Sequence, residues 1–178
     1  MMYHLDTYYP TIVYDNYLID PLIMNHLLQG DQDTHKKRKK VEYDYTGGDN
    51  PYLSFICDIS SGFLKMNQFS HQRERWYMDI IRYQLKDDTK RVSSGLAWHC
   101  ENDVAYSRDV VTVLMYLHID EEVKDGNLLY KDKKNNKLTL GIKSGTTVIM
   151  DGNVPHKPQD PYGSGRRDLI IISFDKSP

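Results

Sequence analysis

The pattern of apolar and polar positions divides the chain near residue 76. Before that point, two segments begin with Asp-Pro or Asn-Pro, the polar cap and first-turn proline typical of a helix start. These motifs predict helices over residues 21–30 and from residue 51 toward residue 62, where glycines are natural stops. A β-branched run at residues 11–14 predicts a strand. Residues 31–49 are polar, and we expect a solvated loop there.

From residue 76 onward the pattern predicts strands almost throughout. Residues 76–85 are rich in β-branched and aromatic side chains and carry apolar residues on both faces, which predicts a strand that is partly covered on each side. Further short apolar runs, separated by turns rich in Gly, Asp, Asn or Pro, predict strands over residues 95–101, 110–118, 126–130, 138–142, 146–150 and 167–174. We therefore expect a mainly β, α+β fold, a sandwich or barrel with the N-terminal helices packed on one outer face. We expect one domain over residues 1–178, in which residues 1–75 support a core over residues 76–174.

Composition excludes little, but it indicates the surroundings in which the protein works. The 178 residues carry a net charge of −2, which gives no global argument for a nucleic-acid partner. The two cysteines are too few for a disulfide framework, so we expect a reducing, cytoplasmic location. No apolar run is long enough to span a membrane, and the first ten residues lack the apolar core of a secretory signal, so we expect a soluble protein. The sequence leaves the oligomeric state open.

Candidate chemistry lies in the motif at residues 98–102, Trp-His-Cys-Glu-Asn. In an extended strand His99 and Glu101 would leave the same face, while Cys100 would point away. His156 ends another apolar segment just before a turn and offers a third ligand. Two imidazoles and one carboxylate, with the remaining positions open, form the ligand set of non-haem Fe(II) oxygenases. Because a His-x-Glu pair alone is common, its surroundings must decide.

Those surroundings contain further motifs in a fixed order. They are Ile-Ile-Arg-Tyr at 80–83, Thr-Val-Leu-Met-Tyr-Leu at 112–117, Asp-Gly-Asn-Leu at 125–128, Lys-Ser-Gly at 143–145 before Thr-Val-Ile-Met-Asp, and Gly-x-Arg at 165–167 before Asp-Leu-Ile-Ile-Ile-Ser-Phe. With the His-x-Glu pair and His156, this order over roughly residues 76–174 resembles the Fe(II)- and 2-oxoglutarate-dependent dioxygenases, most closely their prolyl-hydroxylase branch.

The resemblance implies a double-stranded β-helix (jelly-roll) core in which His99, Glu101 and His156 hold Fe(II). It further implies 2-oxoglutarate as co-substrate, O₂ as oxidant, and hydroxylation of a C–H bond, typically in a peptide or protein, with release of succinate and CO₂. Alternatives stay open at this point. The same chemistry could act on a small molecule or a nucleic acid, or a cupin-like metal site could operate without 2-oxoglutarate. A non-catalytic module could instead bind nucleic acid through the basic run at residues 35–40, although nearby acidic residues cancel most of its charge.

The distal carboxylate of 2-oxoglutarate would need a guanidinium inside the core, where an unpaired charge is costly. Arg166 and Arg167 are both candidates. If Arg167 points inward, the strand alternation also turns Leu169 inward; if Arg166 does, Asp168 shares the interior. We favour Arg167, which also fits the Gly-x-Arg motif. Tyr116 resembles the strand tyrosine that donates its hydroxyl to the same carboxylate in the prolyl-hydroxylase branch.

Two departures from the family pattern concern the metal and the turn after residue 124. Glu101 stands where the family usually has Asp, and Asp103 is the fallback ligand if the strand ends early. Asn102 follows the carboxylate and could support it from outside the ligand shell. The Asp-Gly-Asn-Leu segment replaces a usual double-glycine turn without touching a ligand.

Overall fold

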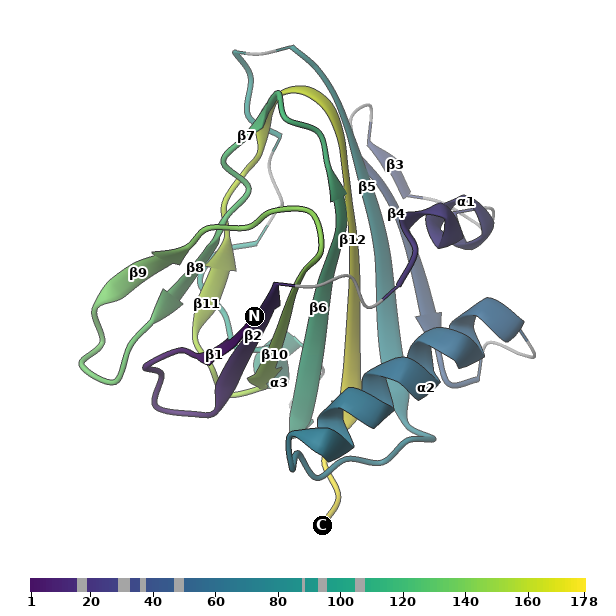
Figure 1. The fold of residues 1–178 in the computed structure, drawn as a ribbon, viewed down its shortest axis with the longest axis vertical. Coiled ribbons are helices and arrows are strands. Elements are labelled where there is room, and N and C mark those ends of the chain that lie inside the picture. Colours follow the sequence, from purple (N-terminus) through teal and green to yellow (C-terminus); the bar gives the residue numbers. More distant parts are fainter. Residues whose placement is uncertain are drawn as a thin grey trace.

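A computed structural model describes residues 1–15, 19–28, 33–35, 38–46, 50–87, 89–92, 96–104 and 108–178. Within these ranges the protein is mainly β, with its strands in two antiparallel sheets (Figure 1). The larger sheet has the order β1-β2-β10-β6-β12-β5-β4-β3, and β7 also pairs with β12. Its strands are β1 (Met2–His4), β2 (Thr11–Asp15), β3 (Asp33–His35), β4 (Arg38–Asp44), β5 (Trp76–Asp87), β6 (Val110–Ile119), β7 (Val123–Lys124), β10 (Thr146–Asp151) and β12 (Tyr162–Asp175).

The smaller sheet has the order β11-β8-β9. Its strands are β8 (Leu128–Lys131), β9 (Lys137–Leu140) and β11 (His156–Pro158). The described helical segments are the 3-10 helix η1 (Pro21–Ile23), α1 (Met24–Leu27), α2 (Pro51–Met66) and α3 (Glu101–Val104). The side chain of Asn50 caps α2, with 2.9 Å between its Oδ1 and the amide N of Tyr52, and α2 continues through the predicted stop at Gly62.

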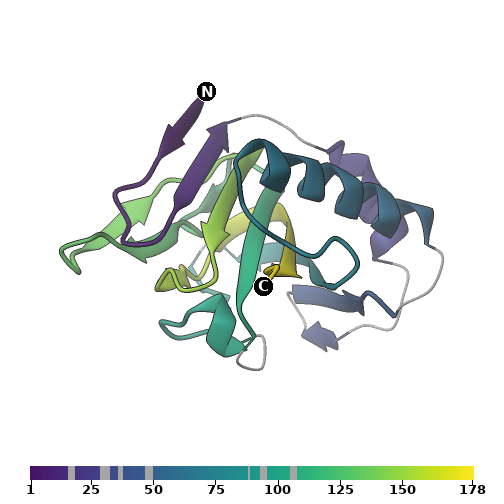
Figure 2. The ribbon, with the colours of Figure 1, turned by 90° about the horizontal axis from the view of Figure 1, so that it is seen from below.

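Alternation along β5, β6 and β12 sends side chains to two separate buried clusters, one on each face of the larger sheet. One face shares its cluster with α2, which runs across the sheet (Figures 1 and 2). The sheet residues of this cluster include Met78, Ile80, Val113, Met115, Ile170 and Ile172. The other face packs against Leu128 and Leu140 of the smaller sheet. Its residues include Ile81, Tyr83, Leu114, Tyr116 and Leu169. The candidate chemistry lies on this second face.

The prediction of a mainly β chain with helical segments before residue 76 is confirmed, but two segments have a different secondary structure from the one predicted. The expected loop at 31–49 contains β4, which pairs with β5 from Arg38 opposite Tyr83 to Asp44 opposite Tyr77. The polar sequence of β4 does not predict a strand. Backbone pairing with β5 holds this segment in place. The expected strand at 95–101 is also wrong. His99 forms an isolated bridge with His156, and Glu101 begins α3.

The predicted strands at 126–130 and 138–142 start and end elsewhere, at 128–131 and 137–140. Asp125 and Gly126 have φ values of 56° and 73°, so they belong to the turn before β8 rather than to the strand. The expected helix stop at residue 30 lies outside the described residues, as do residues 36 and 37 of the basic run. None of the described helices is both long enough and apolar enough to cross a membrane.

Candidate metal centre

Backbone pairing brings the two histidines together. The amide of His99 donates to the carbonyl of His156 at 3.0 Å, and the amide of His156 donates to the carbonyl of His99 at 2.9 Å. Their imidazole centroids lie 4.4 Å apart. This reciprocal pair extends the smaller sheet by one strand position and turns both imidazoles to the same face. Long-range backbone pairing therefore positions the two histidine side chains. A strand that continues through Glu101, as the sequence predicted, is not what brings them together.

Asn102 fixes the turn that carries Glu101. Its amide donates to the carbonyl of Gly152 at 3.0 Å, and its side-chain oxygen accepts from the amide of Val110 at 2.9 Å. The side-chain nitrogen of Asn102 donates to Oδ1 of Asn153 at 2.9 Å. These contacts tie the start of α3 to the ends of β6 and β10, so Glu101 has a defined position beside the histidines.

The three side chains converge on a small volume. Oε1 of Glu101 lies 3.2 Å from Nε2 of His156 and 3.7 Å from Nε2 of His99. One ligand atom from each residue lies within 4.8 Å of the others. Adjacent ligands of an octahedral ion with bonds of about 2.1 Å lie about 3 Å apart, so small side-chain shifts would suffice. The donor set of two imidazoles and a carboxylate therefore fits a divalent transition metal.

Backbone carbonyls set the tautomer of both histidines. Nδ1 of His99 lies 2.9 Å from the carbonyl oxygen of Ala97, and Nδ1 of His156 lies 3.0 Å from that of Val154. Because a carbonyl only accepts, each Nδ1 must carry the proton and donate. Each Nε2 then presents its lone pair to the shared volume, which is the arrangement of a metal-ligating histidine.

Electrostatics keep the carboxylate ionised. Burial alone would raise the pKa of Glu101, but hydrogen bonds from His156 and His99 lower it to about 2. Burial would likewise lower the pKa of His99, but its contact with Glu101 raises it above the usual value. In the metal-free protein the carboxylate thus stabilises the imidazolium of His99, and a metal would replace that proton.

A cavity of about 290 Å³ connects these ligands with a buried arginine. Its lining includes His99, Glu101, His156, Tyr116 and Arg167. Leucines at positions 114, 128 and 169 line its apolar part.

Arg167 on β12 is 1% exposed. Its guanidinium lies 5.2 Å from the ring centroids of both Tyr83 and Tyr116. Nη2 donates to the carbonyl of Gly126 at 2.8 Å, and Nε has no hydrogen-bond partner. No carboxylate of the described residues forms an ion pair with this guanidinium. A buried cation without an anion is costly, so the pocket is suited to an anionic ligand.

Tyr116 lines the same pocket from β6 and is also 1% exposed. Burial raises the pKa of Tyr116 to about 12, even though the neighbouring Arg167 lowers it. The phenol is therefore protonated near neutral pH and can donate a hydrogen bond to an anion beside Arg167.

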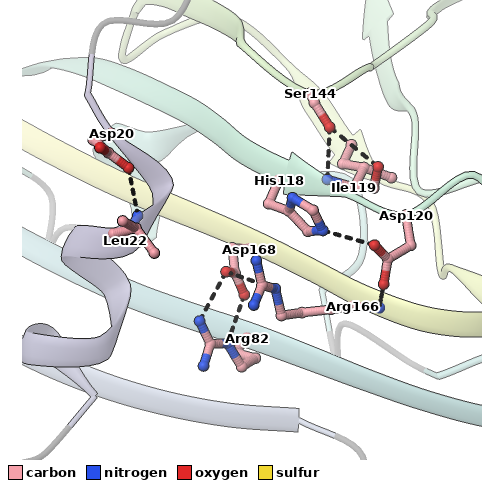
Figure 3. A network of polar contacts seen from close by, with 9 residues as sticks. All are labelled: Asp20, Leu22, Arg82, His118, Ile119, Asp120, Ser144, Arg166 and Asp168. Carbon is pink, nitrogen blue, oxygen red and sulfur yellow. Dashed lines mark hydrogen bonds and ion pairs between the residues drawn. The ribbon is translucent and has the colours of Figure 1, made fainter.

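Arg166 lies on the opposite face of the sheet, where Figure 3 shows it beside Asp168. Nε of Arg166 is 3.3 Å from Oδ2 of Asp168. Arg82 donates two hydrogen bonds to the same carboxylate, at 2.7 and 2.9 Å. Asp168 is fully buried and neutralised by these arginines, and Arg166 does not line the cavity.

Two other residues considered from the sequence lie away from the ligand group. Asp103, the fallback ligand, is exposed and outside the convergent group of the described residues. Cys100 lies 3.4 Å from the carbonyl of Asn153, and burial raises the pKa of its thiol. A thiolate nucleophile at this position is therefore disfavoured.

The structure also adds residues that the sequence did not single out. Tyr83 packs against Arg167, and Lys40 and Asp79 form an ion pair of 3.0 Å on the cavity wall. Alternation along β5 groups Tyr83 with Asp79, but it cannot reveal which face of the strand meets the cavity. Lys40 also pairs with Glu42 at 2.6 Å, so its charge is neutralised locally.

No protein-family model and no curated protein sequence matches the chain. Solved structures do match it. A 2OG-Fe(II) oxygenase family oxidoreductase from Burkholderia pseudomallei aligns with a TM-score of 0.67 at 12% identity, over 94% of this chain and 84% of that one. A Trichoplax adhaerens prolyl hydroxylase, solved with a peptide fragment of hypoxia inducible factor, aligns with a TM-score of 0.64 at 14% identity, over 93% and 83%.

A third match is HygX from Streptomyces hygroscopicus, solved with nickel and 2-oxoglutarate bound. It aligns with a TM-score of 0.61 at 10% identity, over 94% of this chain and 83% of that one. At these identities the likeness concerns the fold, and the chain has the fold of the 2-oxoglutarate-dependent Fe(II) oxygenases.

Proposed function

We propose that this protein is a non-haem Fe(II)- and 2-oxoglutarate-dependent dioxygenase that hydroxylates a C–H bond and releases succinate and CO₂. One observation carries the proposal. A convergent group of His99, Glu101 and His156 shares one cavity with Arg167, a buried cation that lacks a carboxylate partner among the described residues. A facial metal site next to an anion pocket is what this reaction requires. The two sheets would then form the double-stranded β-helix core of this fold.

Each residue has a distinct task in this proposal. Nε2 of both histidines and the carboxylate of Glu101 would hold Fe(II), leaving positions for the oxo acid and O₂. When bound, Fe(II) supplies the activation of O₂ and the oxidation of co-substrate and substrate. Arg167 would pair with the distal carboxylate of 2-oxoglutarate, and Tyr116 would donate its hydroxyl to the same group. The leucines that line the cavity exclude water and strengthen both contacts.

We further propose a peptide or protein as the substrate. The prolyl hydroxylase from Trichoplax adhaerens, which shares the fold, is bound to a peptide fragment in its structure. The cavity is near the lower end of the volumes usual for ligand sites, and the co-substrate must occupy part of it. It therefore has room for one side chain of a larger substrate rather than for a bulky free molecule.

An anaerobic titration tests the metal and co-substrate proposals together. Addition of 2-oxoglutarate to the protein with Fe(II) should produce a weak visible metal-to-ligand charge-transfer band, whereas succinate, which lacks the keto group, should not. His99→Ala, Glu101→Ala and His156→Ala should each lose the band while the far-ultraviolet circular dichroism stays unchanged. Fe(II) binding that 2-oxoglutarate leaves unaltered would instead support a cupin-like site. Absence of Fe(II) binding in the unmodified protein would refute the proposal.

A further inference from the structure

The backbone bridge that pairs His99 with His156 also defines the outer surface of the smaller sheet. Because neighbouring residues of a strand point to opposite faces, Trp98 and Lys157 face outward where the histidines face the cavity. In β8 and β9, Lys131 is paired directly with Lys137. Lys157 is paired with Leu129, two residues from Lys131 and therefore on the same face. We call the residues Trp98, Lys131, Lys137 and Lys157 the outer basic face.

Contacts with Trp98 order part of this surface. The ammonium groups of Lys131 and Lys137 each lie 5.7 Å from the Trp98 ring. These cation–π contacts hold two like charges over one indole. Adjacent strands are about 4.8 Å apart and two residues of a strand span about 6.7 Å, so the three lysines originate within about 12 Å of one another on the sheet.

The charge of the outer basic face is uncompensated. None of its three lysines forms an ion pair with a carboxylate in the described part of the chain, whereas Lys40, Lys133, Lys143 and Lys176 each do. The segment at residues 128–140 contains four lysines and one aspartate, although the whole chain has a net charge of −2. The carboxylate of that aspartate accepts hydrogen bonds from residues 134 and 136 within its own turn. The positive charge is thus concentrated here on an otherwise acidic molecule.

We propose that the outer basic face is a docking surface for an acidic polypeptide segment. Charge complementarity argues for an anion, and the close cluster of ammonium groups suits carboxylates that leave one side of an extended chain about every 7 Å. Single-stranded nucleic acid is a poorer fit, because its bases need an open aromatic face and lysines lie over the Trp98 ring. If the proposed function holds, this surface selects substrates that carry an acidic segment apart from the oxidised residue, because the outer basic face points away from the cavity.

Fluorescence of Trp98 can report this binding directly, since the other tryptophan, Trp76, is buried. The full-length protein is titrated at low salt with a decaglutamate peptide, and in parallel with a decathymidine oligonucleotide. The peptide should change the emission saturably, and added salt should weaken its binding. Lys131→Gln/Lys137→Gln should weaken binding by about fivefold or more, as expected for the loss of two exposed charge pairs. Lys65→Gln/Lys86→Gln removes two exposed lysines elsewhere and should change affinity little.

Three results would overturn the docking surface: no saturable response to the peptide, equal losses in both double variants, or tighter binding of the oligonucleotide at the same salt. Fe(II) and 2-oxoglutarate binding should be unchanged in Lys131→Gln/Lys137→Gln. Failure of the docking test with an intact charge-transfer band would therefore reject this surface alone. Loss of the band in the unmodified protein would reject the proposed function instead.

Discussion

Replacement of Arg167 by methionine should separate co-substrate binding from folding. The guanidinium is almost fully buried, has one backbone acceptor, and leaves Nε without a partner. In the proposed complex it neutralises a carboxylate inside the cavity. Removing one partner of a buried ion pair costs about 3–5 kcal/mol, because the other charge is left uncompensated. The dissociation constant for 2-oxoglutarate should therefore rise roughly a hundredfold to several-thousandfold.

The metal-free protein should respond quite differently to the same change. Methionine removes a buried charge that has no counter-ion within the described structure, and this favours folding. It also removes one hydrogen bond, worth about 1 kcal/mol, and two contacts with the rings of Tyr83 and Tyr116, worth about 0.5–2 kcal/mol each. These effects oppose each other. We expect the free energy of unfolding, measured with denaturant, to change by less than about 2 kcal/mol.

Arg166→Met is the matched control, since it removes the same charge from the adjacent position. Asp168 keeps its two hydrogen bonds from Arg82, so the free energy of unfolding should change by less than about 1 kcal/mol. The dissociation constant for 2-oxoglutarate should stay as in the unmodified protein. Pyruvate, an oxo acid without a distal carboxylate, should bind equally to the unmodified protein and to Arg167→Met. Equal losses of 2-oxoglutarate affinity in both variants, or a matching loss for pyruvate, would refute the reasoning.

Three further predictions concern the metal centre and its support. Asn102→Ala should weaken Fe(II) binding by about 10- to 100-fold in a metal titration, because the start of α3 loses its side-chain hydrogen bonds with Val110 and Asn153. Gly126→Ala should weaken 2-oxoglutarate binding, because φ is 73° and a Cβ would lie 3.0 Å from Nε of Arg167; unchanged affinity would contradict this. In the metal-free protein the raised pKa of His99 stabilises the fold below pH 6.5, and this contribution is lost as pH rises through the raised value. The lowered pKa of Glu101 stabilises the fold above pH 4.5, and this contribution is lost as pH falls toward about 2. The free energy of unfolding, measured against pH in the presence of a chelator, should therefore fall at both the acidic and the alkaline end.

Apolar runs rich in β-branched and aromatic residues were enough to locate the main strands, because β5, β6 and β12 each place one face in the first buried cluster and the other face in the second. These runs could not reveal β4, whose charged sequence is typical of a solvated loop and whose position depends on pairing with β5. The sequence also did not predict how the metal ligands are brought together. Convergence of His99 and Glu101 was expected from a continuous strand, whereas the structure obtains it from a bridge to His156 followed by a helical turn. Such long-range pairing leaves no local pattern in the sequence.

A register shift in the pairing of β6 with β12 separates the anion pocket around Arg167 from the polar network on the other face of the sheet. Tyr116 lies opposite Leu169, but His118 lies opposite Asp168, so Leu117 is an extra residue on β6. Leu117 belongs to the cluster on the α2 side of the sheet, and cross-strand pairing places His118 on that side too. His118 contacts Asp120 at 2.7 Å, and Asp120 accepts the backbone amide of Arg166 at 2.6 Å (Figure 3).

Without the extra residue, strict alternation would carry the side chain of residue 118 to the cavity face whenever residue 116 pointed there. A titratable imidazole would then enter the anion pocket beside Arg167. The bulge instead keeps Tyr116 as the polar group that lines this part of the cavity from β6, and it leaves His118 to hold Asp120 against the amide of Arg166. The extra residue thus separates a pocket suited to one anion from a network that neutralises its own charges. Alternation along β12 turns Arg166 and Arg167 to opposite faces, and the extra residue on β6 keeps the side chain of His118 on the face of Arg166.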